Sequence, residues 1–208
     1  MERLDENKMV QILDTCYQKA LDGIPMVSES VNELGDYYLN TYATTEKAIE
    51  KLIDTQVQKC AISGFLTGLG GLIVLPVAIP ANVSSVLYVQ LRMIASIAYM
   101  NGYDVRHDEV KTMVYLCLVG SSVSDILKGV GIKVGTKVAG NLIKQIPGKV
   151  LIQINKAVGV RLLTKYGTKG AINLVKCIPL AGGIVGGGFD YISTRTIGNY
   201  AKSTFCNE

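Results

Sequence analysis

The feature that most constrains the fold is a run of 32 residues, Cys60 to Leu91, without a charged side chain. Such a run must be buried in a protein core or in a bilayer, where a spanning helix needs about 20 apolar residues. Proline costs about 3 kcal/mol in a helix interior and glycine about 1 kcal/mol relative to alanine, so one straight helix is disfavoured. The residues that would break it are Gly64, Gly68, Gly70, Gly71, Pro76 and Pro80.

A second uncharged patch, Cys177 to Phe189, contains the sequence LAGGIVGG, which resembles GLGGLIV in the first run. Its glycines include Gly182, Gly183, Gly186 and Gly187. Interrupted apolar segments of this kind form tight helix crossings in a soluble core or re-entrant hairpins in a membrane. Both interpretations predict apolar helical hairpins, and a true membrane span remains a third.

Helical periodicity dominates the rest of the chain, with apolar residues three and four positions apart. The expected helices cover residues 4–21, 28–42, 45–60, 82–100 and 109–119, with Thr44 or Thr45, Asn82 and Asp108 as candidate N-caps. A further segment begins near Ser122, and Pro147, Gly167 and Pro179 predict about four more short helices. Alternation typical of a strand is confined to Val150–Ile154. We therefore predict an all-α fold, a single-domain multi-helix bundle over residues 1–208 with Gly-rich apolar helical hairpins.

The charge is strongly polarised along the chain. Residues 1–125 carry 9 basic and 15 acidic side chains, whereas residues 126–208 carry 12 basic and 2 acidic ones. From Ile126 to Phe189 there are ten Lys or Arg and no Asp or Glu. A block of one charge sign next to apolar segments favours contact with anionic matter, a membrane surface above all.

The lysines of the basic half fall on helix faces. Lys133, Lys137 and Lys144 share one face, and Lys149 and Lys156 lie opposite an apolar stripe formed by Val150, Leu151, Ile154, Val158 and Leu162. Nine of the ten charges are Lys, which suits diffuse attraction to phosphate headgroups, whereas nucleic-acid recognition favours Arg and stacking aromatic rings. We expect anionic membrane lipid as the partner, with a merely solvated basic face as the alternative and nucleic acid disfavoured.

Polar residues also border the apolar segments. Arg92 is the first charge after the long run, and Asp190 ends the second patch five residues before Arg195. Acids and bases at such borders are often paired, but a helix-capping Asp190 and a snorkelling Arg92 are the favoured interpretation. Beyond Gly159, a continuing helix would place Arg161 and Lys165 on the apolar face, so either the helix ends there or these side chains snorkel.

No catalytic, cofactor or metal site is predicted. The glycine-rich stretch 129–137 lacks the Gly-Lys-Ser/Thr ending of a phosphate loop, and the single histidine, His107, sits at an expected helix start where a surface role is favoured. Five widely spaced cysteines without a CxxC pair indicate buried thiols in a reducing compartment. The acidic, polar first residues do not resemble a secretory signal, so we expect a cytoplasmic protein.

The order of these segments resembles the EcsC family of bacterial helical proteins over about Leu21 to Phe205. The resemblance is carried by LDGIP (21–25), residues 63–104, DILKGVGIKVG (125–135), IPGKV (146–150), RLLTKYGTKG (161–170) and IPLAGGIVGGGFD (178–190). The family is named after a gene that neighbours an ABC exporter, and EcsC-like domains have been suggested as membrane-acting effectors in bacterial conflict systems. No catalytic motif accompanies the family.

Together these observations predict a non-enzymatic protein, peripheral to the inner membrane and held there by its Lys-rich face and Gly-rich patches. A membrane-protein partner such as an ABC exporter is a further expectation, implied by the resemblance. A membrane-perturbing, pore-forming effector and a soluble lipid-carrying or interaction module remain alternatives, and an enzyme is the least favoured class.

Overall fold

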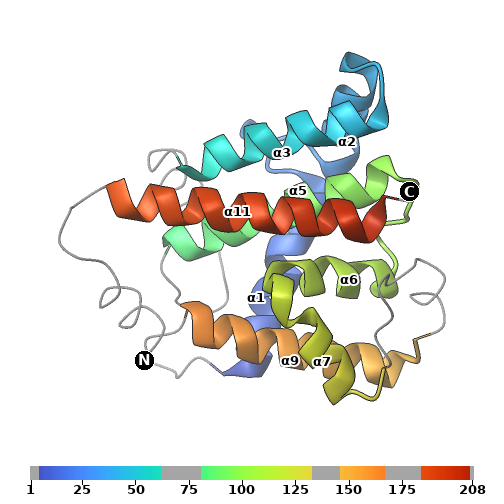
Figure 1. Ribbon diagram of the computed structural model, residues 1–208, viewed down its shortest axis with the longest axis vertical. Coiled ribbons are helices and arrows are strands. Elements are labelled where there is room, and N and C mark those ends of the chain that lie inside the picture. Colours follow the sequence, from blue (N-terminus) through green and yellow to red (C-terminus); the bar gives the residue numbers. More distant parts are fainter. Residues whose placement is uncertain (1–4, 62–80, 133–145, 167–183, 207–208) are drawn as a thin grey trace.

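The computed structural model describes residues 5–61, 81–132, 146–166 and 184–206. Within these residues the chain is 82% helical, with eight α-helices and no strand, which confirms the predicted all-α bundle (Figure 1). The elements are α1 (Glu6–Asp22), α2 (Val31–Thr41), α3 (Thr45–Ala61), α5 (Ala81–Met100), α6 (Asp108–Val119), the short 3₁₀ turn η1 (Gly120–Ser122), α7 (Val123–Gly129), α9 (Gly148–Tyr166) and α11 (Ile184–Phe205). Most of the predicted Gly-rich hairpin positions lie outside the described residues: Gly64, Gly68, Gly70, Gly71, Pro76, Pro80, Gly182 and Gly183.

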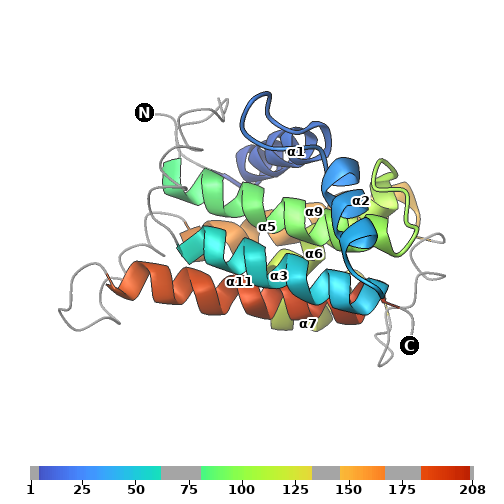
Figure 2. The same ribbon diagram turned by 90° about the horizontal axis from the view of Figure 1, so that it is seen from above.

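Helix α5 is the centre of the bundle and packs against α1, α2, α3, α6 and α11. In Figure 2 it lies between α1 and α3, with α11 beyond α3. Among the described helices, α5 is the one long and apolar enough to cross a membrane, over Val83–Met100 with a mean hydropathy of 1.3. That segment is 89% buried inside the protein, as expected of a helix that other helices surround.

Close approach of helices favours glycine at Gly35, Gly198 and Gly159, and a Cβ added at Gly35 of α2 would lie 2.5 Å from Cδ1 of Tyr99 in α5. A Cβ added at Gly198 of α11 would lie 2.9 Å from Cγ2 of Ile53 in α3, and one at Gly159 of α9 would lie 3.0 Å from the Glu6 carbonyl oxygen of α1. Larger residues at these points would force the helix pairs apart. Gly159 therefore lies inside α9 because packing requires a small residue there, and it does not end the helix.

Some helices begin after the polar N-cap residue expected from the sequence, and others do not. Ser30 and Glu33 form a capping box at α2, and the Lys47 amide donates to Thr44 Oγ1 at 3.2 Å at the start of α3. The predicted N-caps Asn82 and Asp108 were wrong, because both lie in the first turn of their helices and His107 precedes α6. An Asp in the first turn also interacts favourably with the helix dipole, so sequence alone does not distinguish it from a cap.

The second half of the chain has longer helices than predicted. The two described helices that follow Pro147 are long, with 19 residues in α9 and 22 in α11, and the predicted number of about four falls partly on residues outside the described ranges. The strand-like stretch Val150–Ile154 lies in α9, and Gly186 and Gly187 lie inside α11. Asp190 is also inside α11 and does not cap it. The low helix propensity of glycine led to the prediction of shorter helices, but tertiary packing offsets the cost of glycine within a helix.

Four helix ends gather at one end of the bundle. Ala61 ends α3, Ala81 begins α5, Tyr166 ends α9 and Ile184 begins α11. In Figures 1 and 2 these ends all lie on the left of the molecule. The two uncharged sequence patches therefore join the helical body at the same end.

Candidate functional site: a basic helix face and an adjoining cavity

Helix α9 has the two-sided character predicted for it. Its inner residues Leu151, Ile154, Val158 and Leu162 are buried, and Val150 packs partly buried against the same core. Lys149 and Lys156 are exposed on the outside, as predicted. The other lysines expected to contact a membrane, Lys133, Lys137 and Lys144, lie outside the described residues.

Two large aliphatic side chains share the outer face of α9. Ile152 is 59% exposed and Val160 is 49% exposed. Lys149, Ile152, Lys156 and Val160 follow spacings of three and four residues, so they form one line along the helix. We call these four residues the α9 outer stripe. Single exposed aliphatic residues are common, but alternation with lysines is typical of helices that lie on membranes.

The remaining cations of α9 reach neighbouring helices. The helix continues past Gly159 to Tyr166. Arg161 is 3.8 Å from Asp125 Oδ2, with about half of its side chain exposed. Lys165 donates from Nζ to Ser193 Oγ of α11 at 3.1 Å. Of the two alternatives for the residues beyond Gly159, the helix does not end there. Instead, the long side chains of Arg161 and Lys165 extend away from the apolar face.

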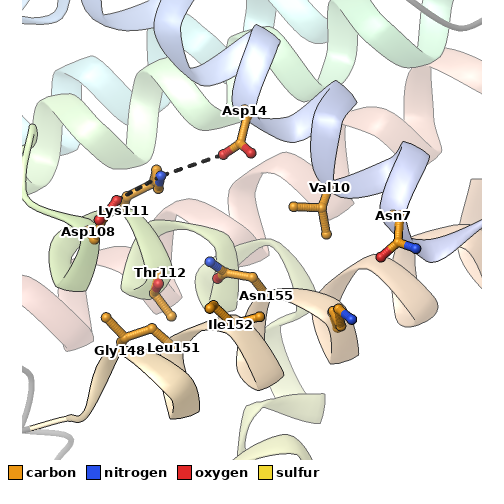
Figure 3. Close-up of a pocket in the computed structure, with 11 residues that line it drawn as sticks. Asn7, Val10, Asp14, Asp108, Lys111, Thr112, Gly148, Leu151, Ile152 and Asn155 are labelled. Atoms are coloured by element: carbon orange, nitrogen blue, oxygen red, sulfur yellow. Dashed lines mark ion pairs between the residues drawn. The ribbon is translucent and has the colours of Figure 1, made fainter.

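A cavity of about 420 Å³ opens between α1, α6 and α9, with Ile152 and Lys156 of the outer stripe on its border (Figure 3). Pockets of roughly 300–1,000 Å³ are the usual size of small-molecule sites. Val10 and Leu151 supply apolar lining. The polar lining side chains are Asn7, Asp14, Asp108, Lys111, Thr112, Asn155 and Lys156.

One end of the cavity holds a compact cluster of charges. Lys111 Nζ is 2.9 Å from Asp108 Oδ1 and 3.7 Å from Asp14 Oδ1. The Tyr115 hydroxyl also donates to Asp14 Oδ1, at 2.8 Å. Burial alone would lower the pKa of Lys111, but Asp108 and Asp14 outweigh it and the pKa is raised. Lys111 is therefore protonated near neutral pH, and the two carboxylates and one ammonium leave one net negative charge.

Two oxygen atoms in the middle of the cavity wall lack partners. Thr112 is 1% exposed, and its Oγ1 accepts and donates no hydrogen bond among the described residues. The Oδ1 atom of Asn155 is likewise buried and unpaired. Figure 3 shows both side chains between the acidic cluster and Ile152. Burying such a group without a partner costs about 1–3 kcal/mol, so these atoms call for an explanation.

The predicted structural polar residues have other partners than those expected. Arg92 is 2% exposed and does not snorkel, since its Nη2 donates to the Glu29 carbonyl oxygen at 2.8 Å and to Glu29 Oε2 at 2.7 Å. Arg195 Nη2 donates to Asp54 Oδ1 at 2.7 Å, which ties α11 to α3. The almost complete burial of Arg92 explains why its charge has to be paired.

Comparison with known families settles the relationship of the chain. A model of the EcsC protein family matches residues 4–206. The chain belongs to the EcsC protein family. Searches of curated proteins and of solved structures found no match.

The cavity of this EcsC protein was not predicted from the sequence. Thr112 stands in the otherwise apolar buried face of α6, and Asn155 follows the fully buried Ile154, so polar residues within apolar stripes were the available signal.

His107 is exposed, and its side chain is 3.2 Å from Asp104 Oδ2. No group of three His, Cys, Asp or Glu suited to a metal occurs within the described ranges. Cys16, Cys60 and Cys117 are buried thiols, and burial raises the pKa of Cys16 and of Cys117 to about 12.

Proposed function

We propose that this EcsC protein is a non-enzymatic protein that attaches peripherally to an anionic membrane through the α9 outer stripe. The observation that carries the proposal is the stripe itself, in which Lys149 and Lys156 alternate with the exposed Ile152 and Val160. The surrounding sequence from Ile126 to Phe189 contains no acidic residue, and Lys111 pairs with Asp14 and Asp108 of the adjoining cavity.

The physics of attachment combines two terms. Each lysine near an anionic leaflet contributes about 1 kcal/mol, and exposed aliphatic side chains add a term by entering the headgroup region. Because the inner face of α9 is packed into the core, the stripe is presented without prior unfolding. Lys133, Lys137 and Lys144 are expected to add to the attraction. The cytoplasmic face of the inner membrane is the proposed location.

Co-sedimentation with vesicles tests this proposal. Binding should require anionic lipid and weaken with salt, as the Debye length falls from about 10 Å at 0.1 M to 3 Å at 1 M. The double variant Lys149→Glu/Lys156→Glu should bind at least about tenfold more weakly. Lys19→Glu/Lys47→Glu is the matched control, because both lysines are exposed on other helices and the change in net charge is equal. Equal loss in the control, or equal binding to zwitterionic vesicles, would contradict the proposal.

A membrane-perturbing effector is the second candidate. The gathering of Ala61, Ala81, Tyr166 and Ile184 at one end of the bundle favours it, because both uncharged patches could then enter a bilayer together. Release of an encapsulated dye by the purified protein, abolished by Gly68→Leu at unchanged thermal stability, would place this candidate first. If no dye is released when vesicle binding is saturated, the effector candidate is contradicted and peripheral attachment is the proposal that remains.

A further inference from the structure

We infer that the cavity between α1, α6 and α9 binds a small zwitterion that carries a phosphate and a protonated primary amine, the chemistry of a phosphoethanolamine headgroup. The inference deepens the proposed membrane attachment and rests on it for the lipid as source of the ligand. The α9 outer stripe shares Ile152 and Lys156 with the cavity border, so a membrane on the stripe would bring headgroups to the cavity mouth.

The charges of the cavity are separated in the manner that a zwitterion requires. At the α1 and α6 side, Asp14 and Asp108 exceed Lys111 by one negative charge. Both contacts with Lys111 use Oδ1 atoms, which leaves the Oδ2 atoms for an incoming ammonium. At the α9 side, Lys156 is exposed and forms no ion pair with a described residue, so it is available to a phosphate. A simple anion would be repelled at the first side and a simple cation at the second.

The residues with unpaired oxygen atoms, Thr112 and Asn155, line the same cavity as these charged groups. The Thr112 hydroxyl can donate to a phosphate oxygen, and Asn155 Oδ1 can accept from an amine once its side chain turns toward the cavity. A ligand that supplies both bonds relieves the cost of burying these atoms without partners. The aliphatic side chains of Val10 and Leu151 suit the glycerol carbons of the same ligand.

Competing occupants fit less well. A divalent cation would be repelled by the Lys111 ammonium, which lies 2.9 and 3.7 Å from the two carboxylates and leaves only one net negative charge there. Inorganic phosphate would interact with Lys156 but leave the acidic side unmatched. The zwitterion is the ligand class that uses both charged sides and the polar centre.

Titration calorimetry of the full chain with soluble glycerophosphoethanolamine tests the site without a membrane. We expect binding that is at least about tenfold tighter than that of glycerol 3-phosphate or of ethanolamine, since each of these lacks one charge. Lys156→Gln should weaken binding about tenfold or more. Lys149→Gln, an equal change on the same exposed face but away from the cavity, should leave it unchanged.

Thr112→Val separates ligand binding from folding. The change removes an unpaired hydroxyl at nearly constant volume, so the melting temperature should stay the same or rise while the affinity for glycerophosphoethanolamine falls about fivefold. Absence of measurable binding at millimolar ligand, or equal losses in Lys149→Gln and Lys156→Gln, would overturn the inference.

Vesicles identify the source of the ligand. If it is a lipid, vesicles containing phosphatidylethanolamine should retain the protein at high salt better than vesicles of phosphatidylcholine, whose amine has no N–H donor. A soluble source gives binding of glycerophosphoethanolamine without that preference and also supports the site. Loss of vesicle binding in Lys149→Glu, with binding of the soluble ligand unchanged, tests the peripheral attachment separately, because Lys149 lies outside the cavity lining.

Discussion

Helices α5 and α9 both lack acidic residues, yet they occupy opposite places in the molecule. By composition α5 resembles a membrane helix, but its apolar segment is 89% buried inside the protein. Helix α9 is less apolar, and it is α9 that exposes Ile152 and Val160 beside lysines. Mean hydropathy therefore locates the core here, whereas the exposed alternation of aliphatic and basic residues on α9 is the surface that we propose for membrane attachment.

Matched aliphatic truncations should give the largest difference between the two helices. Leu91→Ala in α5 removes a fully buried side chain and should lower the free energy of unfolding by about 2–5 kcal/mol. Ile152→Ala in α9 removes a side chain that is 59% exposed and should change it by less than about 0.5 kcal/mol. Chemical denaturation measures both, and comparable losses would show that the outer stripe is packed in solution.

The inner face of α9 should behave like the core. Gly159→Leu overpacks the contact with Glu6 and Val10 of α1 and should cost about 1–3 kcal/mol in urea unfolding. Gly129→Ala in α7 meets no atom within 4 Å and should be neutral or slightly stabilising. A neutral Gly159→Leu would mean that α9 moves freely against α1.

The outer face of α9 should affect membrane binding instead of stability. Val160→Ser removes apolar contact and should weaken binding to anionic vesicles about threefold to tenfold. Val27→Ser is the matched control, since Val27 is 41% exposed in the loop after α1 and Val160 is 49% exposed. Unchanged binding by Val160→Ser would restrict the role of the stripe to its lysines.

The ion pair between Arg92 of α5 and Glu29 predicts that the stability of the fold depends slightly on pH. Hydrogen bonds from its own backbone amide and from Arg92 lower the pKa of Glu29. A lowered folded-state pKa means that the stabilisation is present above the unfolded pKa of about 4.3 and is lost as the pH falls through the folded value. Glu29→Gln should therefore melt slightly below the wild type at pH 7, and the gap should close below about pH 4. The effect is small because the Glu29 side chain is 65% exposed.

Sequence periodicity predicted the helices of the first half and the two faces of α9, because burial of one helix face leaves a repeating pattern. It failed where tertiary contacts decide, as at Gly159, whose missing side chain serves packing against α1. The cavity could not be predicted either, since Asp14, Thr112 and Asn155 are far apart in the chain and only the crossing of α1, α6 and α9 brings them together. The partner of Arg92 was missed because Glu29 is 63 residues away.

The position of Arg92 bears on how readily α5 could enter a bilayer. It is the single charged residue of α5 and lies near the middle of the 20-residue helix. In a bilayer this side chain would sit close to the midplane, where an arginine costs about 2.5–3.5 kcal/mol on the scale of translocon insertion. One guanidinium group thus makes insertion of this otherwise apolar segment into a bilayer less favourable. Removing that charge would weaken the pairing with Glu29 and also bring the nascent helix closer to the insertion threshold.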